Sequence, residues 1–342
     1  MPHKTFLAFI WPSLLAMVLF IAVPIISLGY QSLFIEHEKV LISTENCGPF
    51  GCKTEVTLDV EAMRQLRQDQ PMGRYNGLDT YSNSSHLAFS DINEIFRTSA
   101  NFGEIRDKVM NLPFYKALIF TLAYTFIVTP LVIVVGFIIA VVVNGLPKLL
   151  KGPVIFFSLL PMIVTPLVGA LVLYWMIDSR GIIGAGLQSL FGDPNLSLKA
   201  SPTLTWVTLF VYGVWHNAPF SFVVFYAGLQ TVPKDTLESA MVDGANRWER
   251  IRFVTVPYLV PLATFIALMQ LMDNFRVFEP IIGFSAAASA TSLSYLIYND
   301  LRASDSPLFG SAAATSMLTI VGVIFLLLPV LRRNWREFNR KS

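Results

Sequence analysis

Long apolar stretches alternate with short polar ones along most of this chain. Six apolar stretches are long enough to cross a bilayer, which takes about 20 consecutive apolar residues. They cover residues 9–34, 117–143, 154–177, 204–229, 258–284 and 312–331. Prolines and glycines interrupt several of them, and transmembrane helices tolerate these residues because neighbouring groups satisfy the freed backbone. The pattern predicts an all-α, polytopic membrane protein with about six transmembrane helices.

The composition supports this prediction. Charged residues make up only 14% of the chain, whereas soluble domains carry about 25%. The net charge of +2 is small and says little about acidic partners. The apolar stretches make the lipid bilayer an expected partner, and no nucleic acid is expected. No small-residue cleavage site follows the first apolar stretch, which is therefore expected to be a retained helix rather than a signal peptide.

Lysine and arginine are distributed unevenly between the short polar segments, and this distribution predicts the orientation in the membrane. One set of segments holds Lys4, Lys148, Lys151, Lys234, Arg247, Arg250, Arg252, Arg332, Arg333, Arg336, Arg340 and Lys341. The opposite short segments hold only Arg180, Lys199 and Arg302. Both termini are therefore expected in the cytoplasm. The predicted parts are an N-terminal helix (1–34), an extracytoplasmic loop (35–116) and a core of five transmembrane helices (117–342).

The long outward loop contains both cysteines of the chain, Cys47 and Cys52, on either side of a Gly-Pro turn. An extracytoplasmic compartment is oxidising, so we expect a disulfide between them, with two free thiols as the alternative. A metal site is not expected, because four ligands are usual and only His37 and His86 share this loop.

The chain has no G-x-x-x-x-G-K-[ST] phosphate-binding loop, no H-E-x-x-H motif and no G-x-S-x-G motif. We therefore expect neither an enzyme nor a bound cofactor. Energy for any active process would come from a partner chain or from an ion gradient.

Residues 230–257, which we call the elbow, form a charged segment between two apolar stretches. Pro233 can start a helix, because its missing N–H is not needed in the first turn. The Asp243-Gly244 pair is expected to end that helix, and a second helix is expected over 245–256. The elbow is then a helix–turn–helix at the cytoplasmic surface. It is either an interfacial amphipathic helix or a docking site for a cytosolic partner.

Polar residues gather in the fifth predicted span, within ALMQLMDNFRVFEP. Gln270, Asp273 and Asn274 fall on one helical face. Polar side chains at membrane depth usually face the interior of a helix bundle or a cavity. The alternative is a structural ion network, for which Asp273, Arg276 and Glu279 have the spacing.

The elbow also carries a resemblance. Its pattern E-[AS]-A-x-x-D-G-A, followed by Phe and Pro, resembles the EAA loop of ABC importer permeases. The matching residues are Glu238, Ser239, Ala240, Asp243, Gly244, Ala245, Phe253 and Pro257. The stretches WPSLLAMVLFIAVPIISLGYQSL, LLPMIVTPLVGALVLYWMID and VWHNAPFSFVVFYAGLQTVP resemble helices of carbohydrate permeases of the maltose and glycerol-3-phosphate type. Ser239 replaces the more usual Ala, and IIGFSAAASATS stands where many members have a Gly-rich stretch.

This resemblance implies one permease subunit of an ATP-driven, binding-protein-dependent carbohydrate importer in a bacterial inner membrane. The implied partners are a second homologous permease, two ATP-binding subunits and an extracytoplasmic substrate-binding protein. In that family the EAA loop is the coupling helix, seated in a cleft of the ATPase. Two rival functions are a secondary carrier driven by an ion gradient, for which Asp273 is the only good intramembrane acid, and a purely structural membrane scaffold.

The resemblance also implies which residues contact the sugar. They are His216, Asn217 and Phe220 on the fourth span and Gln270, Asp273, Asn274 and Phe278 on the fifth. Amide and carboxylate groups hydrogen-bond to hydroxyls, and aromatic faces stack on the C–H surfaces of pyranoses. His216 has an interhelical hydrogen bond as its alternative role. The sequence leaves the carbohydrate open: a monosaccharide, a polyol, an oligosaccharide or a substituted glycoside, charged or neutral.

Overall fold

The structure is a computed structural model that describes residues 3–37, 40–48, 51–99, 101–199, 201–302 and 308–339. Arg340 and Lys341 of the predicted cytoplasmic end lie outside these residues. The chain folds as two compact units. The first unit combines Met1–Lys116 with Leu296–Val321, and the second combines Ala117–Tyr295 with Gly322–Ser342. Three helices pass from one unit into the other: α7 (Pro113–Gly145), α16 (Leu293–Leu301) and α17 (Phe309–Asn339).

The first unit begins with an apolar helix and continues into short helices and strands. Its own elements are α1 (His3–Met17), a π-helical turn (Val18–Ala22), α2 (Val23–Gln31), β1 (Phe34–Ile35), β2 (Leu41–Gly48), β3 (Gly51–Leu58), α3 (Val60–Asp69), β4 (Arg74–Tyr75), α4 (Asp79–Ser82), α5 (Phe89–Thr98) and α6 (Phe102–Asn111). The side chain of Asp59 caps α3 by accepting a hydrogen bond from the backbone N–H of Ala62.

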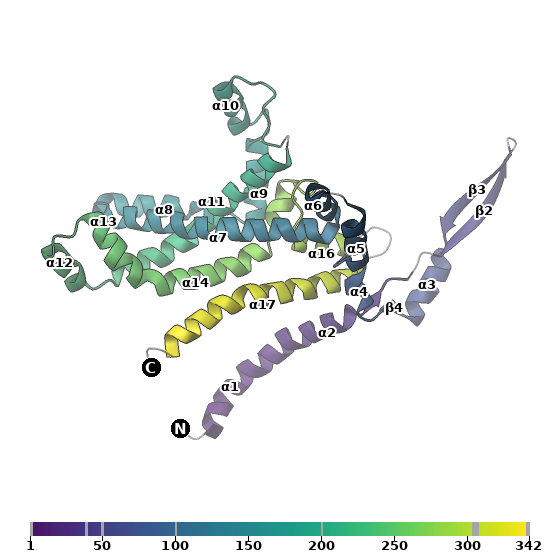
Figure 1. The fold of residues 1–342 in the computed structure, drawn as a ribbon, viewed down its shortest axis with the longest axis horizontal. Helices are drawn as coiled ribbons and strands as arrows, with labels where there is room; N and C mark the ends of the chain where they lie inside the picture. The colour runs from purple at the N-terminus through teal and green to yellow at the C-terminus, as the bar shows by residue number, and fades with distance from the viewer. Residues whose placement is uncertain are drawn as a thin grey trace. The chain divides into compact units, whose positions relative to one another are not determined.

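The strands of the first unit are a departure from the predicted all-α class. β1 pairs with β4, and β2 pairs with β3 as an antiparallel hairpin, visible with its labels in Figure 1. The two strands contain several β-branched residues, which favour strands. The departure is local, because the apolar stretches predicted as spans are mainly helical.

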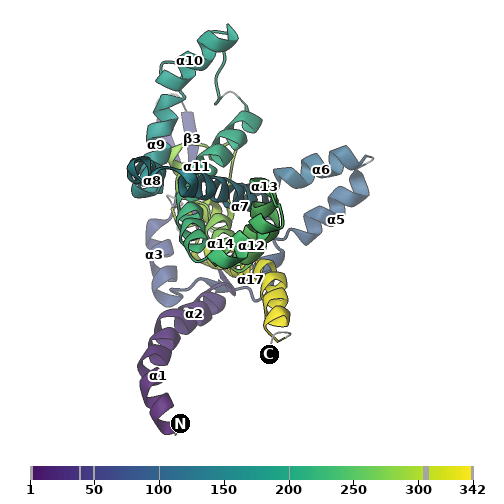
Figure 2. The same ribbon diagram turned by 90° about the vertical axis from the view of Figure 1, so that its left-hand side faces the viewer.

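The second unit is a helical bundle. Its own elements are α8 (Lys148–Ile163), α9 (Pro166–Met176), α10 (Ile182–Phe191), α11 (Pro202–Gln230), α12 (Lys234–Val242), α13 (Arg247–Arg250), a π-helical turn (Ile251–Thr255), α14 (Val256–Phe275) and α15 (Glu279–Gly283). Helices α7, α8, α11 and α14 run side by side in Figures 1 and 2, and α11 packs against both α8 and α14. This packing positions the candidate site described below.

Five helices in the described residues are long and apolar enough to cross a membrane. They are Ala8–Gln31, Pro113–Gly145, Pro202–Gln230, Arg247–Phe275 and Phe309–Arg332. The pair formed by Lys148–Ile163 and Pro166–Met176 counts as a sixth span if it is taken together. The prediction of a polytopic helical membrane protein is thereby confirmed.

The third predicted span, 154–177, is not one straight helix. The chain bends by 96° between α8 and α9, and Thr165 has the extended conformation, with φ −60° and ψ 144°. Pro166 is the physical reason, because proline disfavours a helical conformation in the residue before it and lacks an N–H to donate. The sequence predicts a transmembrane helix that tolerates its prolines, but Pro166 interrupts this helix.

The fifth predicted span, 258–284, is interrupted as well. α14 ends at Phe275, and the short helix α15 begins at Glu279. Pro280 cannot donate to the carbonyl of Arg276 four residues earlier, and its ring would clash with that carbonyl in a continuous helix. The two short helices that follow the breaks, α9 and α15, pack against each other.

Two apolar clusters form the core of the second unit. One surrounds Phe120, Tyr124, Leu209 and Tyr212, and the other surrounds Phe222 and its neighbours on α7, α11 and α14. The helices approach closely where small residues meet: a side chain added at Gly136 of α7 would collide with Ser221 of α11. Small residues at helix contacts are typical of membrane bundles.

Candidate functional site

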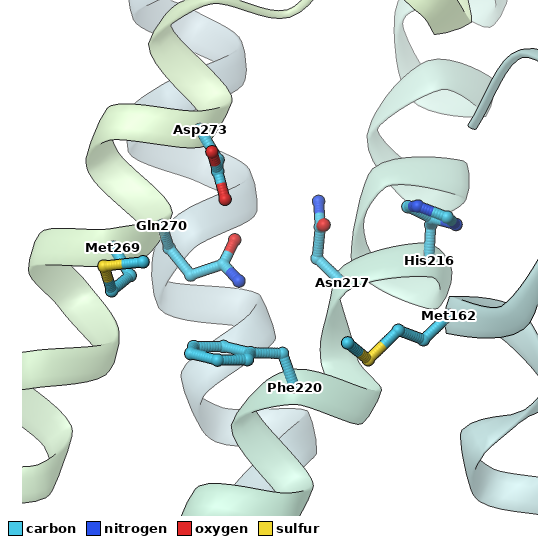
Figure 3. A pocket seen from close by; sticks show the side chains of 7 residues that line it. All are labelled: Met162, His216, Asn217, Phe220, Met269, Gln270 and Asp273. Atoms are coloured by element: carbon cyan, nitrogen blue, oxygen red, sulfur yellow. The ribbon is translucent and has the colours of Figure 1, made fainter. Parts of the chain in front are cut away.

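A cavity of about 190 Å³ lies within the second unit, between α8, α11 and α14. Figure 3 shows the side chains that line it, which are Met162, His216, Asn217, Phe220, Met269, Gln270 and Asp273. The amide groups of Asn217 and Gln270 point into the space between α11 and α14, with the ring of Phe220 below them. A small cavity with convergent polar groups in an apolar bundle is typical of a ligand site.

The structure brings together most of the residues that the sequence analysis proposed as substrate contacts. Met162 and Met269 were missed, because an apolar side chain within an apolar span carries no signal of its own. Two proposed residues, Asn274 and Phe278, do not line the cavity. Phe278 precedes α15, beyond the end of α14.

Asn274 lies behind the cavity and joins three helices. Its Nδ2 donates to Thr129 Oγ1 of α7 at 3.0 Å and to Gln270 Oε1 at 3.4 Å, while its Oδ1 accepts from Asn217 Nδ2 of α11 at 3.4 Å. Asn274 and Gln270 are each only 2% exposed. Asn274 therefore holds the two amide side chains that face the cavity.

Asp273 combines both roles that its spacing suggested. It lines the cavity, and its Oδ1 accepts a hydrogen bond of 2.7 Å from Arg276. Glu279, which we had placed in the same ion network, is exposed and forms no ion pair among the described residues. The Asp273–Arg276 pair is itself well exposed, so it contributes little to stability.

His216 stacks on Tyr212 with ring centroids 5.8 Å apart and planes at 12°. Tyr212 is fixed in turn, because its hydroxyl donates to the carbonyl of Pro166 at 2.6 Å. His216 Nδ1 is buried and has no hydrogen-bond partner among the described residues. The interhelical hydrogen bond that was the alternative role is therefore not made at this nitrogen.

The elbow folds as a helix–turn–helix. α12 ends at Val242, and Gly244 adopts the left-handed conformation with φ +84°. Its amide donates to Met241 and that of Ala245 to Ala240, which satisfies carbonyls at the helix end. The helix end at Asp243-Gly244 is the one predicted from the sequence.

The second arm of the elbow begins with a capping box. Asn246 Oδ1 accepts from the backbone N–H of Glu249 at 2.9 Å, and Glu249 Oε2 accepts from that of Asn246 at 2.8 Å. The N-x-x-E signal was present in the sequence and was overlooked. The arm then runs without interruption into α14, so that Arg247–Phe275 is one helix of 29 residues.

The elbow exposes apolar side chains of both arms. Met241 is 49% exposed, Val242 88%, Trp248 68% and Phe253 67%. The EAA-matching Glu238, Ser239, Asp243 and Gly244 are exposed, whereas Ala240 and Ala245 are partly buried. Neighbouring apolar side chains on a surface mark an interaction site.

The hairpin places the two cysteines opposite each other. In the register of β2 and β3, Cys47 pairs with Cys52, and directly opposed residues of antiparallel strands have Cα atoms about 4.5–5.5 Å apart. That spacing suits a disulfide. The side chains of both cysteines lie outside the described residues, so the bond itself stays a prediction.

The fold and the cavity define a polytopic helical membrane protein with a polar site inside its bundle. Comparison with known families gives a match over residues 103–336 to the model of the binding-protein-dependent transport system inner membrane component. That match covers most of the chain. The chain therefore belongs to this family, and the predicted resemblance to ABC importer permeases is confirmed.

Individual relatives agree with this assignment. The chain is 26% identical over 224 residues to the trehalose/maltose transport system permease protein MalF of Thermococcus litoralis, covering 64% of this chain and 74% of that one. It is 31% identical over 237 residues to the probable ABC transporter permease YesP of Bacillus subtilis, covering 67% and 75%. These relatives are permeases and not enzymes.

A solved structure shares the fold. It is that of a bacterial ABC transporter involved in the import of the acidic polysaccharide alginate. The TM-score is 0.65 at 19% identity, with 97% of this chain and 96% of the other covered.

Proposed function

We propose that this chain is one permease subunit of an ATP-driven, binding-protein-dependent importer of a carbohydrate. Its partners would be a second homologous permease, two ATP-binding subunits and an extracytoplasmic substrate-binding protein. The family assignment supports the general activity, and the relatives whose names refer to sugars support the class of substrate. The termini and the elbow would lie on the cytoplasmic side, as the distribution of basic residues predicts.

The observation that carries the proposal is the cavity. It offers amide donors and acceptors from Asn217 and Gln270, a carboxylate from Asp273, the imidazole of His216 and the ring of Phe220. Sugar hydroxyls need directional partners of both kinds, and a pyranose presents a C–H face to an aromatic ring. This set of side chains suits a carbohydrate in transit better than an ion, since the described residues hold no cluster of metal-ligating groups.

We further propose that the elbow couples the membrane helices to the ATPase. Its exposed apolar residues suit a cleft on another protein, and the left-handed Gly244 fixes the angle between its arms. The docked surface would include Glu238, Ser239, Ala240, Asp243, Gly244 and Ala245. The continuous helix from Arg247 to Phe275 connects that surface to Gln270 and Asp273 at the cavity.

Transport by the reconstituted complex tests the proposal. Uptake of a labelled carbohydrate into proteoliposomes should require ATP on the side of the membrane where the ATPase subunits lie. A hydrolysis-deficient ATPase should abolish this uptake. Ionophores that collapse proton and sodium gradients should have no effect. Uptake that persists without hydrolysis but stops with ionophores would instead support the gradient-driven carrier.

A further inference from the structure

A buried histidine lies in the first unit. His86 follows α4 and is 0% exposed. Its Nδ1 lies 2.8 Å from Asn83 Oδ1, and its Nε2 lies 3.1 Å from the backbone carbonyl oxygen of Ser311, in the first turn of α17. Both ring nitrogens therefore face oxygen atoms.

Both of these oxygens can only accept hydrogen bonds. The Ser311 oxygen is a backbone carbonyl. The orientation of the Asn83 amide is fixed, because Asn83 Oδ1 also accepts from the backbone N–H of Ser85 at 3.1 Å. Rotating the amide would point its NH₂ group at that N–H. A neutral imidazole has one N–H and one lone pair, so either tautomer leaves a lone pair facing an oxygen; only the imidazolium donates at both nitrogens.

A carboxylate completes the arrangement. Ser311 Oγ donates to Asp300 Oδ2 at 2.8 Å, so Ser311 bridges the acid of α16 and the imidazole. Burial raises the pKa of Asp300, whereas the bond from Ser311 and the charge of His86 lower it. A proton on His86 thus offsets part of the cost of burying the Asp300 carboxylate.

We propose that His86 is protonated at both nitrogens in the folded protein, and that it forms with Asn83, Ser311 and Asp300 an acid-strengthened latch. The latch ties residues 83–86 of the long loop to the first turn of α17. Raising the pH removes one proton from His86 and leaves a lone pair against an oxygen, so the latch weakens.

Other titratable groups lie around the latch. Glu36 Oε1 accepts from the backbone N–H of Gly310, next to Ser311. Tyr81 of α4 contacts Ser32, and Tyr115 of α7 donates to the carbonyl of Leu87. Variants of His86 and Asp300 separate the response of the imidazole from that of the buried carboxyl group.

Hydrogen exchange of the full chain tests the latch. The chain would be purified with its accompanying subunits in lipid nanodiscs, and exchange would be followed in peptides covering 79–88 and 308–316 at pH 6 and pH 8. After correction for the intrinsic pH dependence of exchange, we expect local opening to increase about tenfold at pH 8, as loss of a charged hydrogen bond implies. This readout is independent of transport, so it can fail or succeed whatever the fate of the proposed function.

Variants separate the latch from general effects. In His86→Gln, local opening at pH 6 should equal that of the parent at pH 8, and it should no longer depend on pH. In Asp300→Asn, the pH dependence of local opening should be smaller than in the parent. His37→Gln is the matched control, because His37 is in the same loop and, among the described residues, hydrogen-bonds to the backbone carbonyl of Gln70; it should behave as the parent. The proposal would be overturned if local opening of the parent did not depend on pH, or if His86→Gln kept the pH response of the parent.

A direct measurement covers the case in which His86→Gln does not fold. The chain contains only four histidines, so ¹⁵N-histidine spectra of the parent are simple enough to assign with single substitutions of the others. At pH 6 to 7 the His86 signals should show two protonated ring nitrogens. Signals of a neutral tautomer at pH 6 would refute the latch.

Discussion

The elbow and the cavity depart from the usual distribution of side chains in opposite directions. The elbow exposes Val242 and Trp248 in a polar segment, whereas the cavity wall buries Gln270 and Asn274 in an apolar bundle. Exposed apolar neighbours and buried polar groups are the two informative departures from ordinary burial. The buried amides satisfy one another, but the exposed apolar groups can be covered only by another chain or by lipid. Changes at the elbow should therefore affect assembly, and changes at the cavity should affect substrate and bundle.

The sharpest test of this comparison is Gly244→Val. A β-branched residue at φ +84° costs about 1–2 kcal/mol and would change the angle between α12 and α13, so uptake should fall about tenfold or more. Gly186→Val is the control, because Gly186 lies in α10 outside the left-handed region and an added Cβ would meet no atom within 4 Å. Membrane insertion of both should match the parent. Normal uptake by Gly244→Val would show that the arm angle does not matter.

Reversing one charge on α12 should have the next largest effect. Glu238→Lys should lose ATPase subunits on detergent extraction, or retain them without stimulation of hydrolysis by the binding protein. Asp235→Lys makes the same change of charge one turn earlier, outside the matching motif, and should be close to the parent. Co-purification and ATPase assays measure both outcomes. If the two variants behave alike, the elbow is better described as an amphipathic helix at the membrane surface.

At the cavity, Asn274→Ala should weaken uptake several-fold and also destabilise the bundle. It removes hydrogen bonds to Thr129, Gln270 and Asn217, each worth roughly 0.5–1.5 kcal/mol. ATPase retention should be unchanged, which separates it from the elbow variants. Thr264→Ala is the control, since among the described residues the Thr264 hydroxyl bonds to a carbonyl of its own helix. Thermal unfolding in detergent and uptake would be measured together, and loss of the ATPase from Asn274→Ala would break the comparison.

The smallest effect is expected for Asp273→Asn. The amide still hydrogen-bonds to a hydroxyl, and the exposed ion pair with Arg276 contributes little. We expect a change of about threefold or less in apparent affinity for substrate and no change in thermal stability. Complete loss of uptake would instead point to a proton or sodium site and would favour the gradient-driven carrier.

Much of this fold could be predicted because its signals are local. Apolar length gave the spans, and Asp243-Gly244 gave the break in the elbow. The effect of the prolines was predicted only in part. Pro166 and Pro280 interrupt helices, whereas Pro130 lies inside the continuous helix α7. The local sequence does not distinguish the two outcomes, which depend on the packing of neighbouring helices.

Long-range contacts account for what the sequence could not provide. Asn274 hydrogen-bonds to Thr129, 145 positions away. Because of this contact, Asn274 lies behind the cavity and not in its lining. His86 meets Ser311 across 225 positions, and nothing near His86 in the sequence indicates a bond to α17. Periodicity identifies a face of one helix, but not which residues of other helices lie against it.

The uninterrupted helix from Arg247 to Phe275 has a mechanical consequence. Arg247 and Gln270 are 23 residues apart along it, which is about 35 Å at the rise of an α-helix. If a helix of that length moves as a rigid body, a tilt of about 10° about one end displaces the other end by about 6 Å. The π-helical turn at Ile251–Thr255 is where such a helix would bend if it yielded. A small rotation of the helix is thus enough to widen or close a space the size of one sugar ring.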